Sequence, residues 1–304
     1  MKRKINRVGT NTLTVSLPSK WVKENRLCAG DEIDLVENGK ELLLNSQKPS
    51  VLGSITVDVS SQDTFGGWMV YVPYRLGYDE IRVHFSSSDH LKRIYDYLPY
   101  MIGFEIIDQG EKYCVLKNIA FGIQEEFDSM YHRLVNVTIS MGMELLGLLV
   151  EGKYEKIEKC ILSEKQANKL DLFCRRMLNL RGYKDPKKTN SKYRIVCLLE
   201  EITDQYRNIG RYVLGKYGVS ALGKRKVSES LLHFFKKISE LVQYCARMTE
   251  HHTPHELTLF KSKMNLLELE MVSLSNNNAE KDKAIVLFLS QVLYSTHNIV
   301  EEIY

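Results

Sequence analysis

Six acidic and amide residues in the second half of the sequence recur three or four positions apart. They are Glu164, Asn168, Asp171, Glu200, Asp204 and Asn208. Spacings of three and four place side chains on one face of a helix, so each group of three would form a row of oxygen atoms. Hard oxygen ligands of this kind suit Fe, Mn or Mg. The residue types and their spacing are therefore compatible with metal ligands.

The same residues have a plainer interpretation. Asp204 precedes Arg207 and Arg211 by three and seven residues, so it could pair with either on a solvated helix face. Such exposed pairs contribute only a few tenths of a kcal/mol, roughly the value measured for isolated helices. The spacing alone leaves both interpretations open.

A second candidate site lies at the N-terminus, where basic residues are concentrated. Residues 1–30 contain Lys2, Arg3, Lys4, Arg7, Lys20, Lys23 and Arg26. Against these seven stands the single Glu24, which gives this segment a net charge of +6, whereas the whole chain carries +4. Two copies side by side would present twice that charge, as a protein that binds duplex DNA does. The alternative is a segment that only dimerises the chain and whose Lys and Arg are ordinary surface residues.

Other functional classes find no support in the sequence. It contains no Walker loop, no GxSxG, no HExxH and no dinucleotide fingerprint, so we expect no enzymatic activity. The six cysteines show no CxxC, which favours a reducing compartment. The longest apolar stretch, 137–150, includes Glu144 and is too short to span a bilayer. We expect a cytoplasmic protein without stable membrane insertion.

Proline and glycine divide the 304 residues into two parts near residue 120. Four of the six prolines precede it, and Pro186 and Pro254 lie in polar stretches between segments of helical periodicity. We expect 120–304 to be helical throughout, with short connections. The predicted helices cover 122–150, 153–181, 191–217, 224–250, 254–275 and 280–303.

An internal repeat organises these helices. Asn168-Lys-Leu-Asp171-Leu172 recurs as Asn265-Leu-Leu-Glu268-Leu269, and a stretch that ends in Asn208-Ile209 recurs as one that ends in Asn298-Ile299. The repeat predicts two three-helix bundles, about 120–218 and 222–304.

The helical part resembles the PhoU family, which modulates phosphate uptake and its signalling. That resemblance implies two three-helix bundles and metal clusters held by acidic residues, here Glu164, Asp171, Glu200 and Asp204, with Asn168 and Asn208 in support. The implied metal is Fe, Mn, Mg or Zn. Arg175 stands where the family has a further acid, and the second repeat has Lys261, Ser290 and Tyr294 in place of acids. One metal site is therefore expected, and a second is not.

The N-terminus, 1–48, resembles the AbrB/MazE/SpoVT class of DNA-binding domain. Strand-like segments flank a short helix at 19–25 that Pro18 begins, and Gly30-Asp31 forms a turn before a strand at 32–36. The resemblance implies a swapped-hairpin β-barrel made by a homodimer, with double-stranded DNA as the partner. The residues expected to contact DNA are Arg3, Lys4, Arg7, Lys20 and Lys23.

Residues 51–119 read as a small α/β domain with strands at 54–60, 80–85, 104–108 and 113–118 and a helix at 89–97. The fold class expected is therefore a multidomain α+β chain, and its order of parts is similar to that of archaeal proteins that join an AbrB-like head to a PhoU-like body. We expect a dimeric transcriptional regulator of phosphate homeostasis. The alternative is an accessory protein of a phosphate transporter or sensor that acts through protein contacts.

Overall fold

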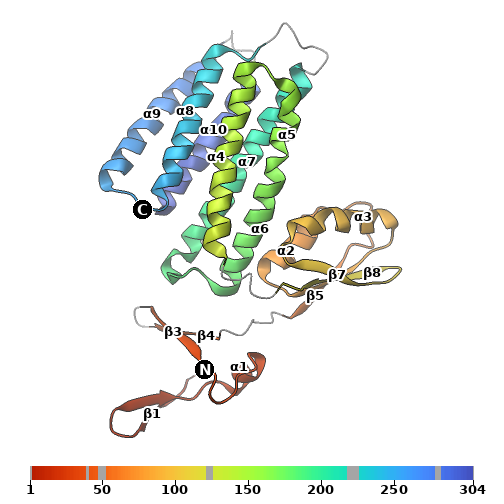
Figure 1. The fold of residues 1–304 in the computed structure, drawn as a ribbon, viewed down its shortest axis with the longest axis vertical. Coiled ribbons are helices and arrows are strands. Elements are labelled where there is room, and N and C mark those ends of the chain that lie inside the picture. The colour runs from red at the N-terminus through yellow and green to blue at the C-terminus, as the bar shows by residue number, and fades with distance from the viewer. Residues whose placement is uncertain are drawn as a thin grey trace.

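The computed structural model describes residues 2–38, 41–46, 53–120, 126–217, 226–277 and 282–303. Along the chain these residues form a small N-terminal head, a middle α/β domain and a helical body (Figure 1). The three parts differ sharply in how much of their apolar surface is buried, and this difference bears directly on function.

The head consists of two antiparallel hairpins and one short helix. Its elements are β1 (Ile5–Val8), β2 (Thr12–Val15), α1 (Ser19–Glu24), β3 (Ile33–Asn38) and β4 (Glu41–Ser46). Pro18 precedes α1, where the amide hydrogen that proline lacks would have no helical partner. Arg26 and Gly30, with φ of 52° and 97°, turn the chain from α1 into β3. These strands agree with the small β domain expected here, while the swapped barrel stays a prediction.

The middle domain is built on a four-stranded sheet of order β5-β6-β8-β7. The strands are β5 (Ser54–Asp58), β6 (Glu80–His84), β7 (Phe104–Gln109) and β8 (Tyr113–Asn118). β5 runs parallel to β6, and the remaining neighbours are antiparallel. All four strands and helix α3 (Ser88–Tyr97), which continues into the 3₁₀ turn η1 (Leu98–Tyr100), lie where the sequence predicts them.

Helix α2 (Trp68–Leu76) was not predicted from the sequence. It contains Pro73, which removes a backbone donor from the helix and normally argues against one. Packing compensates, because Val70, Pro73 and Tyr74 are buried in the core of the middle domain. Local propensity is therefore overridden by tertiary contacts at this element.

The body is helical over its described residues. Its helices are α4 (Phe127–Glu151), α5 (Ile157–Ile161), α6 (Ser163–Arg181), α7 (Thr189–Tyr217), α8 (Glu229–Met248), α9 (Pro254–Asn276) and α10 (Lys283–Ile303), with 3₁₀ turns at η3 (Tyr154–Lys156) and η4 (Pro186–Lys188). The single helix predicted over 153–181 is wrong, because η3, α5 and α6 replace it. This short segment buries Tyr154, Ile157 and Cys160 and packs against α4 and α7. Its direction is therefore set by these contacts, and it does not continue the axis of α6. The predicted starts at 122, 224 and 280 lie outside the described residues.

The helices form two mutually packed groups within one hydrophobic core. α4, α6 and α7 contact one another, as do α8, α9 and α10, and the contacts α7 with α10 and α4 with α8 join the groups. Gly142 of α4 permits a close approach, because a Cβ there would lie 2.7 Å from the ring of Tyr206 on α7.

Helix α4 is the one described helix that is long and apolar enough to cross a membrane. Core helices of folded proteins pass the same test. In the most apolar 18-residue stretch of α4, 44% is buried inside the structure, and the helix contacts α6, α7 and α8. Its composition is thus accounted for by its place in the core.

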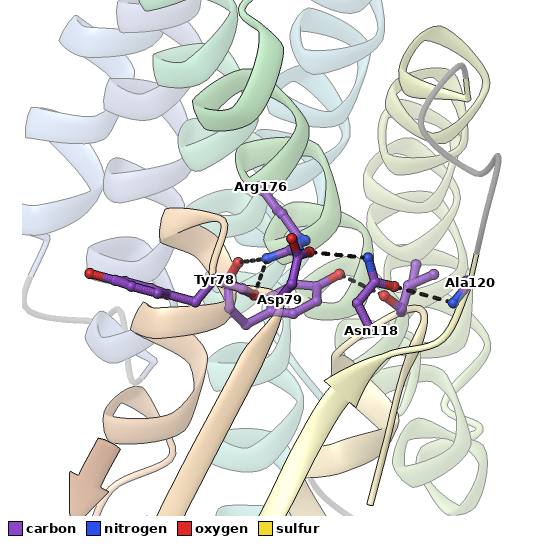
Figure 2. A network of polar contacts seen from close by, with 7 residues as sticks. Tyr78, Asp79, Asn118, Ala120 and Arg176 are labelled. Carbon is purple, nitrogen blue, oxygen red and sulfur yellow. Dashed lines mark hydrogen bonds and ion pairs between the residues drawn. The ribbon is translucent and has the colours of Figure 1, made fainter. Parts of the chain in front are cut away.

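A buried arginine joins the middle domain to the body. Arg176 on α6 is 2% exposed, and its guanidinium donates to the carbonyl oxygens of Tyr74 (2.6 Å) and Tyr78 (2.8 Å) and to Asp79 Oδ1 (2.8 Å). Asn118 donates from Nδ2 to the same carboxylate oxygen at 3.4 Å, and Figure 2 shows Asp79 between the two donors. This network satisfies a charge that would otherwise be very costly to bury.

Apolar and aromatic contacts surround this guanidinium. It lies 5.0 Å from the ring centroids of both Tyr74 and Phe104, a geometry that favours a cation. Leu172, one turn earlier on α6, is 5% exposed and belongs to the core of the middle domain. Asn179, further along the helix, donates to the carbonyl oxygen of Arg75 at 2.8 Å. One face of α6 is therefore a docking surface for α2.

We expect Arg176→Ala to loosen the middle domain from the body. The change removes the guanidinium donor from Asp79 and from two carbonyl groups, and leaves the Asp79 carboxylate with only the longer bond from Asn118, so the free energy of unfolding should fall by about 3 kcal/mol. Hydrogen exchange of α2 amides should accelerate while that of α8 does not. The matched control is Arg194→Ala, whose side chain is 46% exposed and 3.8 Å from Glu201. Equal effects of the two substitutions would contradict this account.

Candidate functional site

The basic residues predicted to bind DNA occupy two elements of the head. Arg3 and Lys4 directly precede β1, Arg7 lies within β1, and Lys20 and Lys23 are on α1. All five are exposed. Lys20 lies 3.8 Å from Glu24, but both side chains are largely in solvent, so the pair is weak and does not prevent a contact with phosphate.

The strand register divides the first hairpin into two faces. Ile5 is paired with Val15 and Arg7 with Leu13, and since side chains alternate along a strand, these four share one face. Arg7 therefore shares a face with apolar residues, a position that the sequence pattern did not reveal.

This apolar face is uncovered in a single chain. Ile5 is 69% exposed and Leu13 is 64% exposed. In the second hairpin, Leu35 and Leu42 are also more than half exposed. No head residue whose burial is described is buried, so one copy of the head has no core of its own. A segment this small cannot retain such surfaces in water without a partner.

The structure brings predicted carboxylates of the body together across α6 and α7, with arginines between them. Arg207 on α7 binds Glu164 on α6 and lies 2.8 Å from Asp204 Oδ1. Arg175 on α6 binds Asp171. We call Glu164, Asp171, Arg175, Glu200, Asp204 and Arg207 the carboxylate cluster.

Burial dominates the electrostatics of this cluster. Asp171 is 1% exposed, and desolvation raises its pKa to about 6 even though Arg175 acts in the opposite direction. Desolvation also raises the pKa of Glu200 to about 8, with further contributions from the charges of Asp171 and Asp204. The pKa of Asp204 is raised by burial and lowered by Arg207. The arginines are thus the counter-ions that keep this region near charge balance.

The cluster as arranged does not fit a metal ion. Across the described residues, no three His, Cys, Asp or Glu side chains gather closely enough to hold one. Three of the four predicted ligands already have an arginine partner. Asn168 Oδ1, Asp171 Oδ1 and Asp204 Oδ1 are buried and accept no hydrogen bond from the described protein. Asp204 Oδ1 is nevertheless ion-paired with Arg207, and the other two oxygens are too few for a metal shell. Metal binding stays a prediction.

The two amides predicted to support the site differ in position. Asn168 donates from Nδ2 to Glu164 at 2.7 Å and so belongs beside the carboxylate cluster. Asn208 donates to Gln205 at 3.4 Å, with no described contact to an acid of the cluster. Helical spacing predicted that both amides would lie beside the acids. In the structure only Asn168 has a described hydrogen bond to an acid of the cluster.

The middle domain reaches the carboxylate cluster, which the sequence did not indicate. The charge of Arg75 on α2 lowers the pKa of Asp171, although desolvation outweighs it. Burial raises the pKa of Tyr71 and of Tyr100, and the charge of Glu164 adds to both shifts. The cluster therefore lies near the junction of the body with the middle domain, and its α6 residues share a helix with Arg176.

We expect Arg207→Met to destabilise the protein more at pH 7.5 than at pH 5. Without the guanidinium, the raised pKa of Asp204 rises further, and a carboxylate with a raised folded-state pKa loses stability as pH increases. Denaturant unfolding at both pH values measures this, with a loss on the order of 3 kcal/mol at the higher pH. Arg211→Met, on the same helix and exposed, serves as the control. A loss independent of pH would refute the assigned role.

Comparison with known proteins found a likeness for the head. A family model described as "Antidote-toxin recognition MazE, bacterial antitoxin" matches residues 7–51. No match was found among curated proteins or among solved structures. The match begins within β1 and covers β2, α1, β3 and β4, which is only a small part of the chain, and Arg3 and Lys4 lie outside it. The N-terminal segment of this protein is thus similar to domains of the AbrB/MazE type, which supports a DNA-binding head.

Proposed function

We propose that this chain is a dimeric transcriptional regulator whose head binds double-stranded DNA. The observation that carries the proposal is the state of the head, which combines a net charge of +6 over residues 1–30 with apolar hairpin faces that a single copy leaves exposed. The match to a MazE-type domain supports the same function.

Dimerisation is proposed on physical grounds. Each hairpin has one apolar face, and two chains together offer four such faces that can cover one another. Burying the exposed parts of Ile5, Leu13 and Leu35 in this way stabilises each by about 1 to 2 kcal/mol. The same assembly doubles the basic charge on one surface, which strengthens attraction to a duplex.

We further propose that the body reports phosphate status to the head in the cytoplasm, as the resemblance to the PhoU family implies. Support comes from α6, which carries Glu164 and Asp171 of the carboxylate cluster and also Arg176 of the joint. A rearrangement at the cluster would therefore act directly on the helix that holds the middle domain. Components of a phosphate transporter or sensor are the partners that would supply the signal.

Two alternatives start from different observations. A phosphate-transport accessory protein would use the head for dimerisation only, but this leaves the basic cluster at 1–30 unexplained. The description of the matching family model points instead to an antitoxin-like regulator, in which the head would also accompany recognition of a toxin protein. The first alternative differs from our proposal in how the head responds to DNA, and the second differs in having a toxin protein as a further partner.

We expect duplex DNA to bind the full chain with a strong dependence on salt. Each neutralised phosphate contributes about −0.9 to the slope of log K against log salt, so six to eight contacts give about −5 to −7. In a dimer Lys20→Ala acts twice and should reduce the magnitude of the slope by about two. It should weaken specific and nonspecific duplexes alike, because backbone contacts carry no sequence information. Fluorescence anisotropy measures both effects.

The control for this titration is Lys236→Ala, an exposed lysine on α8 far along the chain from the head. It should leave the slope unchanged. A folded dimer whose DNA affinity is independent of salt would eliminate the proposed function and favour the transport-accessory alternative.

Metal content is a separate prediction. If Glu164, Asp171, Glu200 and Asp204 do hold Fe, Mn, Mg or Zn in solution, Arg175 and Arg207 must give up their present partners first. Elemental analysis of the purified chain should then show at most one site per chain, and Asp204→Ala should abolish it. Metal content that Asp204→Ala leaves unchanged would exclude this location.

A further inference from the structure

The outward face of α9 carries four exposed apolar residues among small uncharged polar ones. Its residues are Leu259, Ser262, Asn265, Leu266, Leu269, Val272 and Ser273. Leu266 and Leu269 are 67% and 70% exposed, while Phe260 and Leu267 on the opposite face are buried in the body core. A helix that is apolar on both faces normally has neighbours on both. We call this surface the α9 outer face.

The internal repeat shows what the equivalent surface does elsewhere in the molecule. Leu172 of α6 corresponds to Leu269 of α9 in the repeated sequence. Leu172 is 5% exposed, because the middle domain covers that side of α6. Figure 1 places α9 at the edge of the body away from α2 and α3, where no described element covers it. The same position is thus occupied in one repeat and open in the other.

We propose that the α9 outer face docks antiparallel against the α9 outer face of a second copy of this chain. The charges that flank the apolar stripe select this partner. Lys261 and Lys263 precede Leu266, whereas Glu268 and Glu270 follow it. Antiparallel pairing about a two-fold axis near Leu266 sets both lysines against both glutamates, whereas parallel pairing sets like charges together.

The apolar residues agree with the same register. With the axis near Leu266, Lys261 faces Glu268 of the second copy, and Leu259 faces Val272. Lys263 faces Glu270, which already lies 2.8 Å from Lys237 of its own chain and has a second carboxylate oxygen to offer. The midpoints of the three pairs fall between residues 264 and 265, between 265 and 266, and between 266 and 267. An axis between Asn265 and Leu266 therefore sets Leu259 directly against Val272, and leaves each lysine about 3 Å along the helix from its glutamate, a distance that these long side chains can span.

Nearby features of α10 extend the surface. Leu287 and Tyr294 are each more than half exposed. Between α9 and α10 lies a hollow of about 380 Å³ lined by residues that include Met264, Glu268 and Tyr294. In the sequence repeat, Tyr294 stands at the position of Asp204, so the acid of the first repeat is replaced by an aromatic ring at a surface that a protein partner could cover.

A contact between two helices is modest in area, so its strength depends on how the copies meet. The proposed head dimer would hold two bodies together at an effective concentration near the millimolar range. The fraction of chains that form the α9 contact therefore rests on the proposed function, because the proposed head dimer sets this local concentration. The location and polarity of the contact follow from α9 itself.

Disulfide trapping in the full chain tests the proposal. Cys28, an exposed native thiol, is first replaced by Ser, and Leu266→Cys is then added. Leu266 lies beside the proposed two-fold axis and so comes close to its own copy, and mild oxidation should yield a covalent dimer. The matched control is Val150→Cys on α4, which is 56% exposed and distant in sequence from α9. We expect Leu266→Cys to cross-link at least about tenfold faster.

Charge reversal tests the polarity of the contact. Lys263→Glu in the Leu266→Cys background should slow cross-linking, and the further change Glu270→Lys should restore it. Circular dichroism of every variant checks that the helices are retained. Restoration would support the antiparallel pair, and no effect of either reversal would overturn it.

The outcomes separate this inference from the proposed function. If Leu266→Cys cross-links no faster than Val150→Cys while the chain still binds DNA as a dimer, the docking proposal fails and the face belongs to a different protein. If cross-linking succeeds and salt-dependent DNA binding is absent, the docking contact stands and the proposed function fails.

Discussion

A single buried guanidinium controls how the parts of this protein are connected. Arg176 is enclosed by two backbone carbonyls, a carboxylate and two aromatic rings, all from the middle domain. A charge held in this way cannot leave its site without a large desolvation cost, so the middle domain and α6 must move as one unit. The positions of α2 and of the sheet behind it depend on this contact.

The same helix, α6, also carries Glu164, Asp171 and Arg175 of the carboxylate cluster. Arg175 precedes Arg176 in the sequence. Arg175 pairs with Asp171 of the carboxylate cluster, whereas Arg176 pairs with Asp79 of the middle domain. Protonation or ligand exchange at Asp171 would therefore change the ion pair of Arg175, which is the residue next to Arg176 on α6. This short distance gives a physical basis for coupling between body and middle domain, without any requirement for a long pathway.

Both ends of the chain have surfaces that a single copy does not complete. The head exposes the apolar faces of its hairpins, and α9 exposes a leucine-rich stripe whose counterpart on α6 is covered. Since free apolar surface of this extent is rare on monomers, the two observations favour the same conclusion. Both surfaces fit the proposed dimer, in which a second copy would cover the head hairpins and the α9 outer face.

The sequence by itself determined the order of parts, most helices and strands, and the type of head. Periodicity and the placement of proline and glycine depend on local chemistry, so segments such as 254–275 and 113–118 were predicted closely. Local chemistry could not predict α2, because its Pro73 is tolerated only through packing. It also placed Asn208 with the acids, and it gave no sign that Arg207 crosses to Glu164 or that Arg176 is buried. These are contacts between residues dozens of positions apart, and only the tertiary structure, which sets the distance and dielectric between charges, decides them.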